Sequence, residues 1–434
     1  MNRVLPILLA AGLTFLLVAR SDAEFVVEIT RGQAEAIPIA IVPFSTPEVA
    51  RDSFDVAQLA NDDLARSGRF KTMGRKDMID QPHDGGSLVI DDWRRLGNDY
   101  VLVGQMLPEA AADRFTIKFE LYNVLTRQRV LGYQISTNRA GLRLASHQVA
   151  DMVFEKIIGV RGAFSTHIAY ISVLGHLPNR IYRLIVADAD GENPHIVMES
   201  KEPLMSPAWS PDGQSLAYVS FEARVPSIYV QTLKTGERRR VSAHAGVNQA
   251  PAWSPDGKKM ALTLSTRDGN LDIYVLDLAT DALTRITDDP AIDTEAQWSK
   301  DGQTLYFTSD RAGGPQIYRI SIAPGSKPTR LTFQGAYNAR PRLSPDESQM
   351  AFVTQDGGGY RIATMDLRAH GEMRVLTKGQ IDVSPSYAPN GAVLIYASRD
   401  RDRGVLALCS ADGSVQQRLT SSEGEVQEPA WGPF

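Results

Sequence analysis

Polar segments in the second half of the chain carry side chains that could bind another molecule. Each segment mixes carboxylate, amide or hydroxyl groups with small residues, which suits a surface that positions a partner by hydrogen bonds. Three carboxylates, Glu295, Asp382 and Glu428, could instead hold a cation, but the segments do not repeat a ligand spacing. We therefore expect neither a metal nor another cofactor. The predicted binding residues are Met205, Ser206, Asn248, Gln249, Ala250, Thr294, Glu295, Asn338, Ala339, Arg340, Asp382, Val383, Gln427 and Glu428.

The side chains that enzymes use do not form a catalytic pattern in this sequence. The histidines are scattered without the spacing of metal ligands. A Gly-x-Ser-x-Gly elbow, which a serine hydrolase would need, does not occur. The pair Gly85-Gly86 lacks the Lys-Ser/Thr ending of a phosphate-binding loop. Because only three residues follow Trp431, we expect no hydrolase domain after it. We predict a binding protein that is not an enzyme.

A repeated phrase predicts the elements that position the polar segments. Pro-Ala-Trp-Ser-Pro-Asp-Gly occupies residues 207–213 and 251–257, and degraded copies begin at residues 296, 341, 385 and 429. The step from one aromatic or Leu anchor to the next is 44 or 45 residues. This period, with short apolar runs between the anchors, is typical of four-stranded β-propeller blades. We place each anchor on the innermost strand, Pro-Asp-Gly in the following turn, and the Trp between neighbouring blades.

Six anchors predict a six-bladed propeller over residues 165–434, closed by the C-terminal strand. The last anchor, at 429–431, has no strands after it, whereas three apolar runs between 168 and 198 have no anchor before them. The C-terminal strand therefore completes the first sheet, so that no sheet edge stays open. The polar segments, which precede the anchors, then surround one mouth of the central channel.

A mixed pattern over residues 37–162 predicts a separate α/β domain. The apolar run at 38–44 indicates a buried strand. A helix is expected at 52–67, capped by Asp52, with Asp62 and Asp63 on its exposed face. The remaining predicted elements are a short helix at 91–97 capped by Asp91, a strand at 100–106, a hairpin of 115–124 and 129–136, and a helix at 139–158.

The amino-terminal residues and the composition indicate an exported protein. Residues 1–23 have a basic start, an apolar run and small residues before Glu24, which predicts a signal peptide. No second apolar run is long enough to span a membrane. A single cysteine, Cys409, excludes an intramolecular disulfide and suits a bacterial periplasm. We expect Cys409 to be a buried, inert thiol. The net charge of −5 gives no support to nucleic-acid binding.

Residues 24–36 have an alternating apolar pattern, with Phe25, Val27 and Ile29 on one side. An alternating terminal segment can be a mobile arm that adds as a strand to a partner's sheet. It can equally be an edge strand packed on its own domain. The sequence leaves both interpretations open.

The whole chain resembles the TolB family, the periplasmic propeller proteins of the Tol–Pal system in Gram-negative bacteria. The resemblance depends on the signal peptide, the α/β domain with its strand at 38–44, the anchors, and the run Leu-Tyr-Phe-Thr-Ser-Asp at 305–310. It implies a monomer that links the inner-membrane transducer TolA to the lipoprotein Pal. It also implies a role in outer-membrane integrity, in constriction during cell division and in colicin import. Other outer-membrane lipoproteins and colicins are further implied partners.

The resemblance also implies where the partners bind. Pal would bind the propeller mouth, and TolA would bind the arm. Family members exchange the arm between packed and released states when Pal binds. The implied TolA-binding residues are Glu24, Phe25, Val26, Val27, Glu28, Ile29, Thr30 and Arg31.

Two other classes of propeller are alternatives. A glycan-binding or peptidoglycan-binding module would favour exposed aromatic side chains at the mouth, where the sequence offers only Tyr337 close by. A peptidase-like propeller is opposed by the missing serine elbow.

Overall fold

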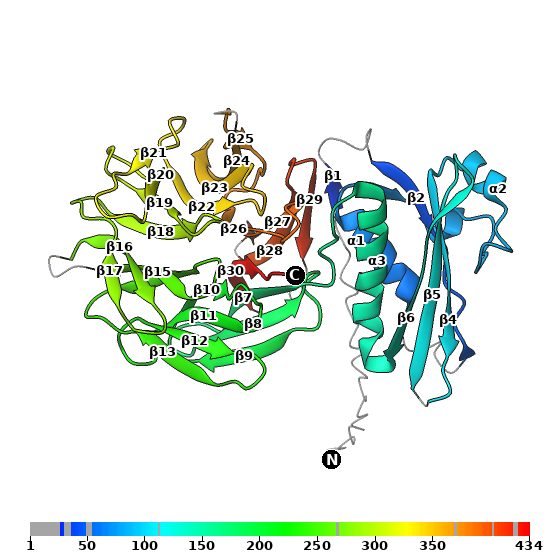
Figure 1. Cartoon of the computed structure of the whole chain (residues 1–434), viewed down its shortest axis with the longest axis horizontal. Helices are drawn as coiled ribbons and strands as arrows, with labels where there is room; N and C mark the ends of the chain where they lie inside the picture. Colours follow the sequence, from blue (N-terminus) through cyan, green and yellow to red (C-terminus); the bar gives the residue numbers. More distant parts are fainter. Residues whose placement is uncertain are drawn as a thin grey trace, which may run out of the picture.

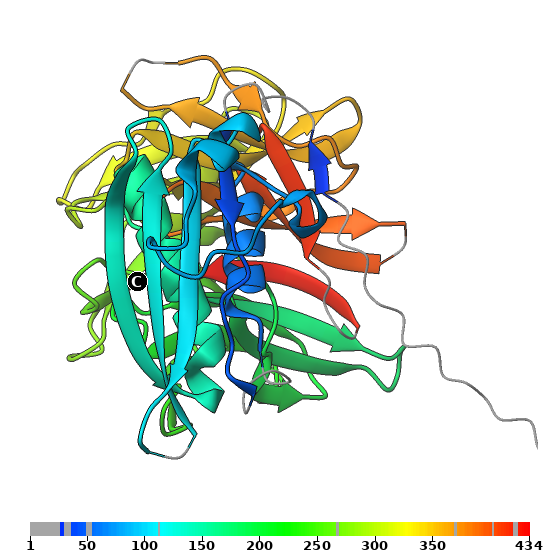
Figure 2. The ribbon, with the colours of Figure 1, turned by 90° about the vertical axis from the view of Figure 1, so that its right-hand side faces the viewer.

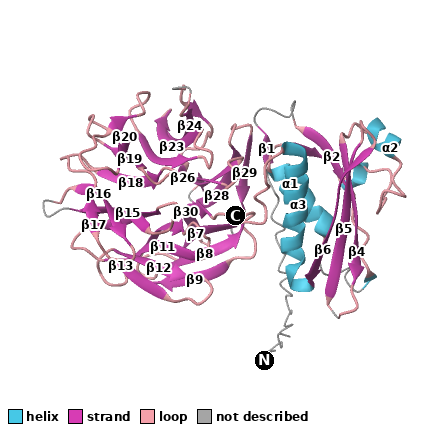
Figure 3. Cartoon of the chain, in the orientation of Figure 1, coloured by secondary structure: helices cyan, strands magenta, loops and turns pink. Residues whose placement is uncertain are grey.

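The computed structural model describes residues 27–29, 36–48, 54–111, 113–265, 269–368, 371–401, 403–419 and 424–434. A helix-covered sheet lies beside a ring of small sheets, and helix α3 (Leu142–Ile158) lies between them (Figure 1). The helices all belong to the amino-terminal part, while the ring consists of strands and loops (Figure 3). The predicted signal peptide lies outside the described residues. No described helix is both long enough and apolar enough to cross a membrane.

The amino-terminal sheet has the order β3-β2-β4-β5-β6. Its strands are β2 (Ile37–Ile41), β3 (Phe70–Thr72), β4 (Tyr100–Pro108), β5 (Arg114–Asn123) and β6 (Gln128–Asn138). Strand β2 is parallel to β3 and β4, and the predicted hairpin is antiparallel. Helices α1 (Val56–Arg66) and α3 pack on one face over buried Ile39 and Phe119, and Val149 of α3 belongs to the same core. The other face buries Trp93 of α2 (Ile90–Arg95); the short helices η3 (Arg75–Asp77) and η4 (Arg139–Gly141) complete the domain.

Three sequence-based details of this domain need correction. Helix α1 is capped by Asp55, whose side chain accepts a hydrogen bond from the Gln58 N–H at 2.9 Å, and Asp52 lies outside the described residues. Asp91 is inside the first turn of α2, which Val89 precedes without a side-chain cap. Asp63 is fully buried instead of exposed. The face of α1 that was predicted to be exposed is covered by α3 and the propeller. A local sequence pattern cannot reveal such long-range packing.

Six sheets form the ring among the described residues, and the predicted six-bladed propeller is confirmed. In the five blades that begin with an anchor segment of their own, the four strands follow in chain order, for example β10-β11-β12-β13. The strands are β7 (His167–Leu174), β8 (Ile181–Asp188), β9 (His195–Ser200), β10 (Leu204–Trp209), β11 (Ser215–Ser220), β12 (Ser227–Thr232), β13 (Arg238–Ser242), β14 (Asn248–Trp253), β15 (Lys259–Ser265), β16 (Leu271–Asp277), β17 (Leu283–Arg285), β18 (Asp293–Trp298), β19 (Thr304–Ser309), β20 (Gln316–Ser321), β21 (Thr329–Arg330), β22 (Asn338–Leu343), β23 (Gln349–Asp356), β24 (Gly359–Asp366), β25 (Arg374–Val375), β26 (Val383–Tyr387), β27 (Val393–Asp400), β28 (Arg403–Ser410), β29 (Val415–Leu419) and β30 (Glu425–Trp431). Cys409 is buried in β28, as expected.

The C-terminal strand closes the ring. Strand β30 pairs antiparallel with β7, with Gln427 opposite Ile171 and Trp431 opposite Ile168. The red strand β30 lies beside the green strands that begin the ring (Figure 2). This arrangement confirms the predicted closure, in which the two ends of the repeat region share one blade.

The anchor tryptophans join neighbouring blades. Trp253 donates its indole N–H to the Ala208 carbonyl at 3.1 Å, and Trp298 donates to the Ala252 carbonyl at 3.0 Å. Trp209 donates across the closure to the Ala430 carbonyl at 3.0 Å. Each acceptor lies on the first strand of the preceding blade. The indole therefore combines apolar packing with a directional bond, which fixes the spacing of the blades.

The Ser-Pro-Asp-Gly part of the anchor forms the turn between the first two strands of a blade. Ser254 donates its hydroxyl to Asp256 at 2.6 Å, and the Asp256 carboxylate accepts the Lys258 N–H at 3.0 Å. Gly257 has a φ of 69°, which favours glycine there. The serine bond is the main reason that the pKa of Asp256 lies below its usual range.

Candidate functional site

The predicted binding segments lie where the first strand of each blade is kinked. One residue of each strand has a left-handed backbone, with φ between 50° and 57°, and each lies at a break in the strand register. A left-handed backbone costs about 1–2 kcal/mol for a residue with a Cβ atom, so the surrounding ring must enforce it. The six residues, here called the kink ring, are Ser206, Ala250, Glu295, Arg340, Ser384 and Glu428.

Backbone groups freed at the kinks find side-chain partners in the preceding blade. The Glu295 N–H donates to the Thr263 hydroxyl at 3.3 Å, and the Arg340 N–H donates to the Thr308 hydroxyl at 3.0 Å. A buried N–H without a partner would be unfavourable, so these threonines stabilise the kinks.

Five residues of the kink ring, all except Ser384, form the floor of a concave mouth with a volume of about 450 Å³. Five of the six blades contribute residues to it. The predicted residues among its lining are Met205, Ser206, Asn248, Gln249, Ala250, Thr294, Glu295, Ala339, Arg340 and Glu428. Asn338, Asp382, Val383 and Gln427 are not part of this lining.

Arg340 links the carboxylates of the kink ring. Its guanidinium pairs with Glu295, donates to the Ser384 hydroxyl, and lies 3.7 Å from Glu428. Burial alone would lower the pKa of Arg340, but the charges of Glu295 and Glu428 outweigh burial and raise it. Asp382 is separate, because its carboxylate accepts bonds from Ser398 and from the Gly379 N–H. Glu295, Asp382 and Glu428 therefore do not converge on a cation, and Arg340 supplies the positive charge at this level of the channel.

Three of the predicted residues support the mouth from inside. Asn248 is fully buried, accepts bonds from the Ser242 hydroxyl and the His244 N–H, and donates to the His244 carbonyl. Asn338 and Asp382 occupy the equivalent buried positions in later blades. Their bonds hold the loops that surround the mouth.

Comparison with known proteins identifies the family. Models of the TolB amino-terminal domain and the TolB beta propeller domain match residues 25–130 and 154–434. The chain is 56% identical over 428 residues to the Tol-Pal system protein TolB of Methylococcus capsulatus, which covers 98% of this chain and 99% of that protein. The chain belongs to the TolB family. It is also 52% identical over 413 residues to TolB of Nitrosococcus oceani, covering 95% and 94% of the two chains.

A solved TolB structure has the same fold over almost the whole chain. The crystal structure of TolB from Acinetobacter baumannii superposes with a TM-score of 0.85 at 39% identity, and covers 95% of this chain and 100% of that one. TolB is a non-enzymatic component of the Tol–Pal system. The resemblance and the predicted non-enzymatic class are therefore confirmed.

Sequence reasoning missed the part of the TolB mouth that comes from other strands and loops. Phe221, Ile292, Thr308 and Asp310 belong to the lining, as does Tyr337, which the sequence had placed close to the mouth. Thr308 and Asp310 stand at and just beyond the end of a second strand, β19, which returns to the mouth after the turn at the anchor. The blade topology, applied to the ends of the second strands, could have predicted them. The same rule covers Phe221, which directly follows β11 as Asp310 follows β19. Ile292 stands in a loop without a repeated signal.

The arm of this TolB-family chain forms a strand on its own propeller. Strand β1 (Val27–Ile29) pairs antiparallel with β29, with Val27 opposite Gln417 and Ile29 opposite Val415 (Figure 1). It extends that blade to five strands. The described part of the arm is therefore an edge strand, as one of the two interpretations expected. It packs on the propeller and not on the α/β domain. Glu24, Phe25, Val26, Thr30 and Arg31 lie outside the described residues.

Proposed function

We propose that this TolB-family protein is a periplasmic coupling protein that binds Pal at its propeller mouth and TolA through its arm. We divide the chain into a signal peptide at 1–23, the arm at 24–36, the α/β domain at 37–162 and the propeller at 165–434. In this role it supports outer-membrane integrity and constriction during division, and colicins exploit it. Membership of the TolB family and the concave mouth support the proposal.

The single observation that carries the Pal assignment is the pre-formed mouth. Its floor is fixed by the kink ring and by Arg340, so a partner would meet a surface that needs little ordering. Its lining combines polar groups, such as Gln249 and Thr294, with apolar side chains such as Ile292, which is 46% exposed. A mixture of exposed apolar side chains and polar groups is typical of surfaces that bind another protein.

The arm pairing supports a coupling role. A three-residue strand at a sheet edge forms few bonds, so its release is energetically accessible. If TolA binds the released arm and Pal favours the packed arm, or the reverse, then one partner changes the affinity for the other. The required difference in free energy is about 1–3 kcal/mol.

A charge placed in the mouth tests the Pal assignment. Thr294→Arg puts a bulky cation between Gln249 and the kink ring, and the Kd for Pal, measured by calorimetry, should rise at least about tenfold. Thr235→Arg is the matched control, because Thr235 is exposed on the turn between β12 and β13, outside the mouth lining. Unchanged Pal affinity in the Thr294→Arg protein, with normal folding, would show that Pal binds elsewhere.

Glycan binding is the second candidate, because the rim of the mouth carries an aromatic pair. Tyr337 and Tyr360 meet edge to face with ring centroids 5.2 Å apart, and Tyr360 is 37% exposed. A sugar ring could stack on Tyr360. Titration with peptidoglycan fragments, followed by the fluorescence of wild-type and Tyr360→Ala proteins, would separate this candidate from Pal binding.

A further inference from the structure

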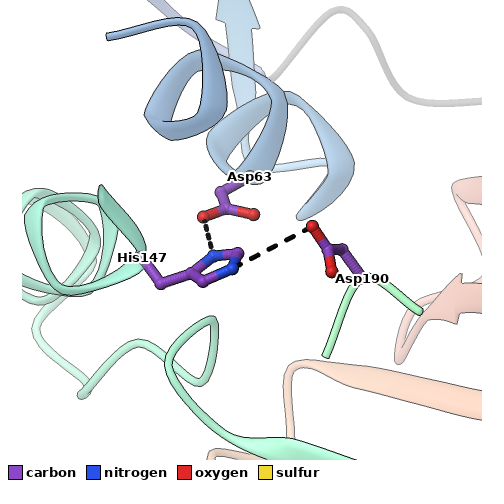
Figure 4. Close-up of side chains that lie close together, drawn as sticks. All are labelled: Asp63, His147 and Asp190. Atoms are coloured by element: carbon purple, nitrogen blue, oxygen red, sulfur yellow. Dashed lines mark hydrogen bonds and ion pairs between the residues drawn. The ribbon is translucent and has the colours of Figure 1, made fainter. Parts of the chain in front are cut away.

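Six ionisable side chains gather where the α/β domain meets the propeller. Asp63 and Arg66 come from α1, and Arg143 and His147 come from α3. Asp188 ends β8 of the propeller, and Asp190 lies in the turn that follows. Asp63, His147 and Asp190 are 0%, 2% and 7% exposed. Figure 4 shows the His147 ring between the carboxylates of the two domains.

His147 faces carboxylates on both sides. Its Nδ1 is 2.6 Å from Asp63 Oδ2 in its own domain. Its Nε2 is 4.0 Å from both Asp188 Oδ2 and Asp190 Oδ2 in the propeller, and has no hydrogen-bond partner in the described structure. The two nitrogens of one ring thus face the two domains.

The two arginines occupy the same carboxylates. Arg66 pairs with Asp63 and lies 4.0 Å from Asp190. Arg143 pairs with Asp188 at 2.7 Å and also with Asp190. A divalent cation among these carboxylates would meet two guanidinium groups in a buried site, which electrostatics disfavours. The ion that can be exchanged here is therefore a proton.

The charges of the cluster balance only when His147 is protonated. Three carboxylates oppose two guanidinium groups, so one positive charge is missing while the imidazole is neutral. Burial alone would lower the pKa of His147, but the charge of Asp63 and its hydrogen bond outweigh burial and raise the pKa. Burial would raise the pKa of Asp190, but Arg66, His147 and Arg143 together lower it.

Other titratable groups border the cluster without replacing His147. Asp151, one turn further along α3, accepts bonds from Ser165 and from the Phe164 N–H, and burial raises its pKa. His167 on β7 lies 3.8 Å from Asp188, and its side chain is 54% exposed. Asp62 on α1 accepts a bond from Gln58, and burial raises its pKa.

We propose that His147 is a proton-operated latch between the α/β domain and the propeller. With both ring nitrogens protonated, the imidazolium donates to Asp63 and attracts Asp188 and Asp190, so the two domains are held together. When the ring loses the proton on Nε2, that nitrogen becomes an acceptor that faces two carboxylates, and the attraction is lost. The raised pKa means that the latch is closed below the pKa of folded His147 and opens as the pH rises through it.

The latch lies on the same domain interface as β29, the propeller strand with which the arm strand β1 pairs. Gly68, just after α1, packs so closely on Val415 of β29 that an added Cβ would lie 2.6 Å from Val415 Cγ2. Val415 is also paired with Ile29 of the arm. A change of domain orientation would therefore move Val415 and disturb the pairing of the arm with β29. The latch itself does not depend on the proposed partners.

Two measurements test the latch in the full-length mature chain. An NMR titration of the imidazole signals should give His147 a pKa above the ordinary value for a histidine side chain. His176, which is exposed on a propeller loop, is the control position for substitution. Fluorescence energy transfer between dyes on Leu125→Cys in the α/β domain and Lys234→Cys in the propeller should change in one step at that pKa. In a His147→Gln variant the step should disappear, and in His176→Gln it should remain.

Two results would overturn the proposal. One is a pKa of His147 at or below the ordinary value for a histidine side chain. The other is a pH step in energy transfer that survives His147→Gln. If His147→Gln does not fold, the titration of the wild-type chain decides alone, together with Asp190→Asn, which should lower the pKa of His147.

Discussion

Removal of residues 429–434 should destroy the closed ring, although these residues are a short tail in the sequence. They include the end of β30, where Ala430 pairs with Ala169 and Trp431 pairs with Ile168. On the edge of β7 that faces away from β8, no other described strand pairs with this end. The deletion therefore removes the last three residues of β30, the inner strand of the first blade.

The expected loss can be worked from the contacts. Loss of the Trp431 side chain, which is partly buried, costs about 3 kcal/mol. Three hydrogen bonds that involve a side chain disappear: Trp431 N–H to the Ser386 hydroxyl, Trp431 indole to the Thr166 hydroxyl, and Trp209 indole to the Ala430 carbonyl. At about 1 kcal/mol each they add about 3 kcal/mol. The sum of about 6 kcal/mol is comparable to the whole stability of a typical domain.

Urea unfolding, followed by tryptophan fluorescence and near-ultraviolet circular dichroism, measures the effect. The truncated chain should lack the cooperative transition of the propeller. The matched control is removal of Phe434 alone, which loses only its stacking on Arg161 and should cost about 0.5–1 kcal/mol. A truncated chain that unfolds at the same urea concentration as the full chain would refute this account of ring closure.

Two further predictions concern the arm and the turns of the blades. Deletion of residues 24–35 removes β1 but no part of the mouth lining. TolA capture in a pull-down should therefore be lost, while Pal binding and the unfolding midpoint persist. Unchanged TolA capture would reject the arm assignment. The pKa of Asp346 is lowered from 3.8 to about 2, mainly by the bond from the Ser344 hydroxyl and then by those from the Ser348 side chain and N–H. The Asp346 carboxylate therefore stabilises the fold fully above pH 3.8, and this stabilisation is lost as the pH falls through 2. The stability advantage of the wild type over Asp346→Asn should therefore shrink between these pH values, and an advantage that is constant with pH would contradict the assigned bond.

The period of the repeat made the propeller predictable. Each anchor phrase predicts a strand, the turn after it and the contact with the neighbouring blade. The first repeat lacks an anchor and the last lacks outer strands, which predicts that the two share one blade. The kinks were not predictable, because Glu295, Arg340 and Glu428 are ordinary residues in extended strands and only the assembled ring imposes their left-handed backbone.

Long-range contacts explain the remaining differences between sequence and structure. The pattern of α1 placed Asp63 toward solvent because it contains no sign of His147, which lies 84 residues away. The alternation in the arm predicted a strand, but the acceptor β29 lies at the other end of the chain. The burial of Asn248 and Asn338 was not predictable, because buried amides and exposed amides look the same in a sequence.

The pairing of Trp431 with Ile168 joins residues 263 positions apart. A chain that emerges amino end first must therefore hold five blades as an open arc, with an unpaired strand edge at β7, until the final strand is free. Closing so long a loop is slow compared with forming each blade. The interval before closure is thus the period in which this protein is most exposed to aggregation, and the period in which a folding helper that covers strand edges would matter most.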